Sequence, residues 1–130
     1  VKDEFYKIAA VFHNRLNIDM PLQSCATVQY ALGRSERKPF LTNEEIAVDS
    51  HYNTYKYKGL PVGPIASPGQ LAVEAVLYPD EEFMNPKKPV LFFVYAGDNR
   101  HEFSYTAEEH ARAKQKYEKL WKDSQNKNKE

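Results

Sequence analysis

The chain has 130 residues, of which 42% are hydrophobic and 13% aromatic, and its 18 Lys and Arg residues balance 18 Asp and Glu residues. This length suits about one globular domain, and a net charge of zero provides no field to attract nucleic acid or an anionic membrane surface. A single cysteine, Cys25, excludes an internal disulfide and a cysteine-based metal cluster, and no apolar run approaches the roughly 20 residues that span a bilayer, so we expect a soluble chain.

The first half of the chain predicts three helices. Apolar residues spaced three and four apart predict an amphipathic helix over residues 3–16. A short helix is predicted through residues 27–32, with Ser24 as its cap. Thr42 and Glu45 have capping-box spacing and predict one or two further helical turns. The expected buried face of the first helix consists of Phe5, Ile8, Ala9, Phe12 and Leu16.

The middle of the chain predicts a helix followed by a hairpin. Ser67 as cap and Pro68 at the first helical position indicate the start of a helix that Pro79 ends. An apolar run and an alternating run then flank a glycine-containing turn, which predicts one β-hairpin near residues 90–105.

The last part of the chain predicts a long C-terminal helix, opened by a second capping box at Thr106 and Glu109. We expect it to fray into a polar tail over residues 124–130. This order of elements predicts an α+β fold with several short helices, in a single domain over residues 1–123. The helix is expected to direct Ala111, Tyr117, Leu120 and Trp121 toward the core.

A rigid loop separates the two halves. Residues 59–69 read GLPVGPIASPG, and residues 52–55, three positions before them, read YNTY. Proline fixes one backbone angle and glycine permits positive ones, so the loop follows a fixed, irregular path. Tyrosine rings suit the apolar faces of sugars, and Asn and Thr suit hydroxyl and acetamido groups. The loop is therefore either a wall of a carbohydrate groove or a tight, hydrogen-bonded connection.

Three glutamates are candidate acid/base groups. Glu4 is expected to be a solvated residue in the first turn of its helix, where acidic side chains are favoured. Glu74 is expected on the exposed face of a short helix. Glu102 follows His101 on a strand, so alternation directs the two side chains to opposite faces and argues against a dyad. The histidines lack metal-ligand spacing, so neither a metal nor a cofactor is expected.

Residues 9–33, 52–69 and 89–113 resemble, in order, three signature segments of the YceG-like family, the endolytic murein transglycosylases. The resemblance extends from about Ile8 to about Tyr117. It implies a single-pass bacterial membrane protein whose extracytoplasmic domain cuts glycan strands inside nascent peptidoglycan. In relatives LQSDPTV is usual where this chain has LQSCATV, so the resemblance assigns no role to position 25.

The resemblance implies a lyase reaction that leaves a 1,6-anhydro-N-acetylmuramoyl end. One carboxylic acid protonates the glycosidic oxygen and, as a carboxylate, then deprotonates the C6 hydroxyl that attacks the anomeric carbon. In the family this acid is a glutamate in a segment like IIEKEA, which alignment places a few residues before Val1. We therefore expect no catalytic residue in this chain, and we expect the N-terminal part of the domain to be missing.

The resemblance also implies a substrate groove and its ligand. The expected partners are peptidoglycan glycan strands and cell-wall synthesis enzymes, with no nucleic acid and with membrane contact only through a segment outside this chain. An alternative remains open, namely a peptidoglycan-binding module that does not cut; a glutamate in an EKEA-like context upstream would favour the enzyme. The expected substrate-binding residues are Gln23, Ser24, Thr27 and Tyr30 on one side and Asn53, Thr54, Tyr55, Gly59, Leu60, Pro61, Gly63 and Pro64 on the other.

Overall fold

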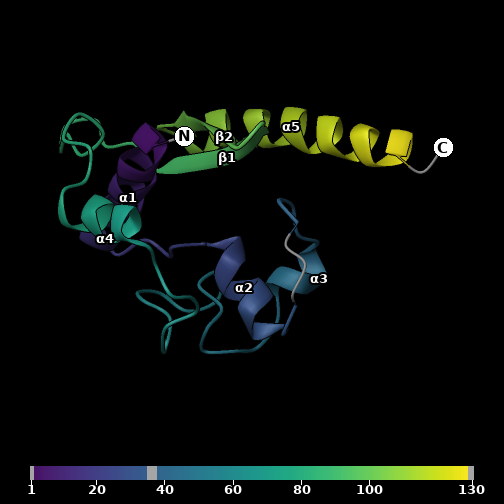
Figure 1. Cartoon of the computed structure of the whole chain (residues 1–130), viewed down its shortest axis with the longest axis horizontal. Helices are drawn as coiled ribbons and strands as arrows, with labels where there is room; N and C mark the ends of the chain where they lie inside the picture. The colour runs from purple at the N-terminus through teal and green to yellow at the C-terminus, as the bar shows by residue number, and fades with distance from the viewer. Residues whose placement is uncertain (1, 35–37, 129–130) are drawn as a thin grey trace. The chain divides into compact units, whose positions relative to one another are not determined.

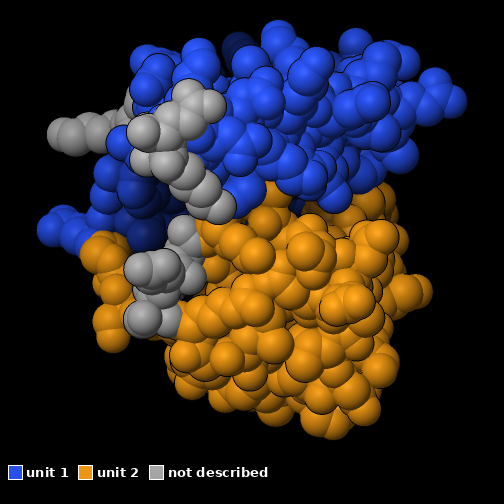
Figure 2. All heavy atoms as spheres, turned by 90° about the vertical axis from the view of Figure 1, so that its right-hand side faces the viewer, with its two compact units in different colours: residues 1–14, 70–130 blue, residues 15–69 orange. Residues whose placement is uncertain are grey.

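Residues 2–34 and 38–128 are described by a computed structural model, in which they form five helices and a two-stranded antiparallel sheet (Figure 1). The α+β class, the hairpin and the long C-terminal helix are thus confirmed. The chain divides into two compact units, residues 15–69 and residues 1–14 with 70–130 (Figure 2). The elements are α1 (Lys2–Asn17), α2 (Cys25–Ala31), α3 (Asn43–Ile46), α4 (Gln70–Leu77), β1 (Phe92–Gly97), β2 (Arg100–Ser104) and α5 (Ala107–Asn128).

The hairpin of β1 and β2 is closed by a two-residue turn, Asp98 and Asn99. Both residues have positive φ, 52° and 59°, as a type I′ turn requires, and Asn and Asp tolerate that conformation better than most residues. The register pairs Phe93 with Phe103, and a bulge follows Tyr95. A short polar turn between two runs of strand-forming residues therefore produces the predicted hairpin.

Each face of the hairpin packs against a different helix. Phe92 and Val94 are buried on the face toward α5, where the Phe92 ring stacks on His110 with 5.0 Å between centroids. On the other face Phe93 meets Phe12 of α1 edge to face, with 5.6 Å between centroids. Figure 1 shows α5 running along the hairpin. Period-two alternation of the side chains places an aromatic layer on both faces.

Helix α1 has the predicted extent, but its most buried face differs from the predicted apolar stripe. Phe5 and Leu16 keep 42% and 39% of their surface exposed, whereas Asn14 is buried. The Asn14 amide nitrogen donates to the carbonyls of Phe83 and Val90, each at 2.8 Å. A polar side chain thereby fixes the rotation of the helix against a distant loop, which helical periodicity alone does not reveal.

Helix α4 begins at Gln70, two residues after the predicted start at Pro68. Ser67 and Pro68 lie in the loop, and Gly69 directly precedes the helix. Glycine is tolerated as a cap residue and has little preference for helical angles, so the helix starts after it. The predicted end before Pro79 is confirmed.

Helix α5 continues to Asn128 and does not fray at residue 123 as expected. Its last turns are rich in Lys, Glu and Gln, which are good helix formers, and Lys122 lies 3.5 Å from Glu118 one turn earlier. Of the predicted core face, Ala111 and Leu120 are exposed, and Tyr117 and Trp121 are half-buried. Ala113 of this helix is buried, which was not predicted. Ala113 and His110, in the first half of the helix, pack against the hairpin.

The unit of residues 15–69 has little regular structure and a small core of Leu22, Val28, Phe40 and Leu41. The capping box of α3 is confirmed: the Thr42 hydroxyl accepts from the Glu45 amide at 3.2 Å, and the Glu45 carboxylate accepts from the Thr42 amide at 2.8 Å. Across the described parts of both units, no helix is long and apolar enough to cross a membrane.

Candidate functional site

The start of α2 and the loop after residue 51, which the sequence singled out separately, are hydrogen-bonded to each other. The Gln23 amide donates to the Thr54 carbonyl at 3.2 Å, and the Ser24 amide donates to the Thr54 hydroxyl at 2.9 Å. The hydroxyls of Thr27 and Thr54 are also 2.9 Å apart. Ser24 occupies the N-cap position, but its side chain makes no cap hydrogen bond. Thr54 thus joins the two segments.

We call this hydrogen-bonded contact between residues 23–27 and 53–54 the joint. Asn53, Thr54 and Thr27 are buried in it. Asn53 has no exposed surface, and its amide nitrogen donates to the carbonyls of Ile46 and Val48 at 2.9 and 2.8 Å. Its amide oxygen accepts from the backbone amide of Tyr55 at 2.9 Å. The polar groups expected to bind substrate are used here within the protein. Direct substrate contact by Asn53 stays a prediction, which this geometry does not favour.

Tyr55 and Arg15 complete the buried part of the joint. The Tyr55 hydroxyl lies 3.3 Å from the Cys25 sulfur, and burial, followed by the nearby thiol, raises the pKa of Tyr55 far above its usual range. The Arg15 guanidinium donates to the carbonyls of Pro21 and Leu22 at 2.8 and 3.2 Å, and burial lowers its pKa.

Sequence reasoning missed Arg15. Its side chain also lies 3.4 Å from the side-chain oxygen of Gln23, a non-glycine residue held at a φ of 51°. The structure places Arg15 one turn after the fully buried Val11, which was not part of the predicted apolar face. A charged residue at such a position usually has buried acceptors, which here are the carbonyls of the following turn.

Several predicted site residues remain accessible. Tyr30 is 46% exposed, and its ring lies 4.7 Å from that of Tyr52. The Tyr52 hydroxyl in turn rests against Gly63, where an added Cβ would lie 3.1 Å from it. Gly59 has a φ of +83°, which favours glycine. We define the α2–loop surface as the exposed side chains Gln23, Tyr30, Leu60 and Pro64; Tyr55, Pro61 and Gly63 are half-buried.

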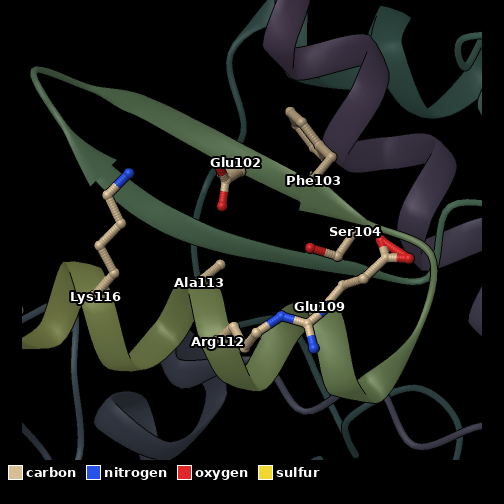
Figure 3. A pocket seen from close by; sticks show the side chains of 7 residues that line it. All are labelled: Glu102, Phe103, Ser104, Glu109, Arg112, Ala113 and Lys116. Carbon is tan, nitrogen blue, oxygen red and sulfur yellow. The ribbon is translucent and has the colours of Figure 1, made fainter.

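The other unit has a charged recess of about 350 Å³ between β2 and α5 (Figure 3). Glu102 points toward α5, and Phe103 points to the opposite side of the hairpin. The Glu102 carboxylate accepts from the Tyr117 hydroxyl at 3.4 Å. The residues that line the recess are Glu102, Phe103, Ser104, Glu109, Arg112, Ala113 and Lys116.

Glu4 differs from its predicted state. It is only 7% exposed, and its carboxylate accepts the backbone amide of His101 at 3.3 Å, while Oε1 lies 3.0 Å from His101 Nδ1. The expectation of a solvated first-turn residue is therefore wrong, because β2 returns to cover this end of α1. His101 and Glu102 do point to opposite faces, as predicted.

A second recess of about 340 Å³ lies beside this pair, along α1 and α4. It is lined mainly by apolar side chains, with Glu4, Asn99 and His101 as polar members. Glu74, by contrast, is exposed and accepts from the Tyr6 hydroxyl at 2.8 Å, as expected for a surface residue. The described residues contain no group of three or more His, Cys, Asp or Glu arranged to hold a metal.

A family model, curated relatives and a solved structure match most of this chain. A model described as the YceG-like family matches residues 1–116. An endolytic murein transglycosylase of Bacillus subtilis (strain 168) is 42% identical over 89% of this chain and 30% of its own length. One from Streptococcus pneumoniae serotype 2 is 35% identical over 82% of this chain and 20% of its own length. A 2.6 Å crystal structure of a yceG-like protein from Listeria monocytogenes has 47% identity and a TM-score of 0.67, over 81% of this chain and 31% of that one. The chain thus spans less than a third of these proteins.

Proposed function

Because the chain belongs to the YceG-like family, we propose that it carries part of the substrate site of an endolytic lytic transglycosylase of peptidoglycan. Such an enzyme cleaves the bond between N-acetylmuramic acid and N-acetylglucosamine and leaves a 1,6-anhydro end on the muramoyl unit. The names of the relatives from Bacillus and Streptococcus support this reaction.

The observation that carries the proposal is the joint between residues 23–27 and residues 53–54. A buried hydroxyl pair and two backbone donors hold the start of α2 and the rigid loop in one fixed relation. The α2–loop surface belongs to the segments held in this way. It offers the half-exposed ring of Tyr30, which suits sugar faces, and the amide of Gln23, which suits hydroxyls. A pre-formed surface loses little entropy when a glycan strand binds.

We place the catalytic acid outside residues 1–130. The three candidate glutamates of this chain are already engaged: Glu4 with His101, Glu74 with Tyr6, and Glu102 with Tyr117. None of these lies in the unit that carries the α2–loop surface. A glutamate upstream of Val1, as the family resemblance implies, would supply the single acid/base group that the reaction needs.

The remaining expectations concern the longer protein. A membrane segment outside this chain would hold the enzyme at the extracytoplasmic face of the cell membrane, where nascent glycan strands and cell-wall synthesis enzymes are its partners. A binding module that does not cut would use the same α2–loop surface.

Titration of the 130-residue protein with a tetrasaccharide of alternating N-acetylglucosamine and N-acetylmuramic acid tests the proposal. Loss of one aromatic contact worth about 0.5–1.5 kcal/mol predicts that Tyr30→Ala weakens binding about two- to tenfold. Tyr78→Ala is the matched control, because Tyr78 is an exposed tyrosine of the other unit. No binding by the parent protein, or equal losses in both variants, would contradict the proposal.

A further inference from the structure

Glu4 directs both of its oxygens at one residue, His101. Oε2 accepts the backbone amide, and Oε1 lies 3.0 Å from the ring nitrogen Nδ1. A carboxylate can only accept hydrogen bonds, so a hydrogen bond between an ionised Glu4 and the ring requires the proton to be on Nδ1. In the neutral ring the other nitrogen, Nε2, then presents a lone pair.

The His101 ring is held in place on its other sides as well. Phe93 and Tyr95 meet it edge to face, with 5.6 and 5.9 Å between ring centroids. Nε2 has no hydrogen-bond partner within residues 2–34 and 38–128, and 24% of the side chain is accessible. These contacts hold the orientation of the imidazole, and part of the side chain stays accessible.

This imidazole lines the apolar recess along α1 and α4, at about 340 Å³ within the usual range for small-molecule sites. We call this recess the α1–α4 groove. It offers two phenylalanine rings, of which Phe5 is 42% exposed, and aliphatic side chains from both helices. Its lining residues suited to a ligand are Phe5, Ile8, Phe12, Ala72, Ala75 and Val76, with Asn99 and His101 as polar members.

We propose that the α1–α4 groove binds one amino-sugar unit of a glycan strand, with His101 Nε2 accepting a hydrogen bond from a sugar hydroxyl. The pyranose ring and the acetamido methyl group have apolar faces that suit Phe5 and the aliphatic wall. Glu4 is a positioning residue that acts through His101. This inference rests on the proposed function, because it assigns a contact region for the same class of ligand to the other unit.

A purely structural role for the pair is the competing explanation, since the two contacts between the Glu4 carboxylate and His101 also attach β2 to α1. His110 provides a matched control, because it is a packed histidine on the opposite face of the same hairpin, stacked on Phe92. Replacing either histidine removes packing, but only His101 is expected to affect a ligand in the groove.

The test combines nitrogen-15 NMR of the histidine rings with titration of the same tetrasaccharide. In the parent protein we expect His101 to be protonated on Nδ1, and we expect its Nε2 signal to move when the sugar is added. His101→Gln should weaken binding about two- to tenfold, the value of one hydrogen bond, and His110→Gln should leave affinity unchanged even where it lowers the melting temperature. Glu4→Ala should abolish the preference for the Nδ1 proton and weaken binding to a similar extent.

The outcomes separate this inference from the proposed function. If the parent binds the sugar while His101→Gln binds equally well and Nε2 does not respond, the groove assignment is wrong and the α2–loop surface stands. A His101 ring protonated on Nε2 in the parent would also overturn the assignment. If the parent does not bind at all, the proposed function fails, and the groove assignment fails with it.

Discussion

Asn53 has its whole side-chain amide inside the protein. Replacing it by alanine leaves the carbonyls of Ile46 and Val48 and the amide of Tyr55 without their partner. Each buried polar group left unpaired costs about 1–3 kcal/mol, so with three such groups we expect Asn53→Ala to lower the free energy of unfolding by at least about 3 kcal/mol. Asn43→Ala, at an exposed position of the same unit, should stay within about 0.5 kcal/mol in the same denaturant titration. Equal changes in the free energy of unfolding of the two variants would contradict a stabilising role for the hydrogen bonds of Asn53.

Gly63 lies against the hydroxyl of Tyr52, and its backbone angle is one that other residues can adopt. A Cβ at position 63 would lie 3.1 Å from that hydroxyl, closer than a relaxed contact, so Gly63→Ala should destabilise the loop by about 1 kcal/mol. The double variant Gly63→Ala/Tyr52→Phe should recover most of that loss, because the crowding oxygen is gone. Gly69→Ala is the control, since nothing lies near its Cβ position. Thermal unfolding of the parent, Gly63→Ala, Tyr52→Phe and the double variant, with Gly69→Ala beside them, tests the coupling, and strictly additive losses would contradict it.

Tyr55 makes the stability of the fold sensitive to alkaline pH. Burial raises its pKa above the ordinary value of 10.0, so the folded protein favours the neutral phenol more than the unfolded chain does. The resulting stabilisation is fully present below pH 10 and is lost as pH rises above it. Tyr55→Phe cannot ionise, so its free energy of unfolding should fall less between pH 9 and pH 11 than that of the parent. Parallel pH curves for the two proteins would contradict this account.

Among the elements, α3 depends most on its cap, because it has only four residues. Thr42→Ala removes the hydroxyl that accepts the Glu45 amide, and loss of such a cap costs about 0.5–2 kcal/mol. We expect the larger end of that range, since little else in so short a helix offsets the loss. Thr42→Ser keeps the hydroxyl and should unfold close to the parent in a denaturant titration. Equal destabilisation by both substitutions would point to the lost methyl group instead of the cap.

Elements specified by neighbouring residues could be predicted from the sequence. The capping box of α3, the hairpin turn at Asp98 and Asn99, and the extent of α1 all depend on residues within a few positions of each other. The rotation of α1 could not be predicted, because Asn14 is bonded to carbonyls 69 and 76 residues away. Glu4 was misjudged for the same reason, since its partner His101 is 97 residues distant.

In the whole molecule, the sequence identified the start of α2 and the rigid loop as candidate site segments, but it did not show how these segments contact each other. We expected the start of α2 and the rigid loop to face each other across an open groove. In the structure Thr27 and Thr54 bond to each other directly, so these hydroxyls lie inside a closed joint. Residue type does not distinguish a threonine that binds sugar from one that binds another threonine. Whether the hydroxyl is accessible to a ligand depends on its burial, which in turn depends on long-range packing.

We propose that this chain binds glycan strands and that cleavage needs a glutamate from outside residues 1–130. The most direct measurement is to incubate purified glycan strands with the 130-residue protein, and to assay both the bound strand and the 1,6-anhydro ends by mass spectrometry. We predict bound strands without new anhydro ends. Release of anhydro-muropeptides that is lost on Glu4→Gln or Glu74→Gln would contradict the account, because the catalytic acid would then lie within this chain.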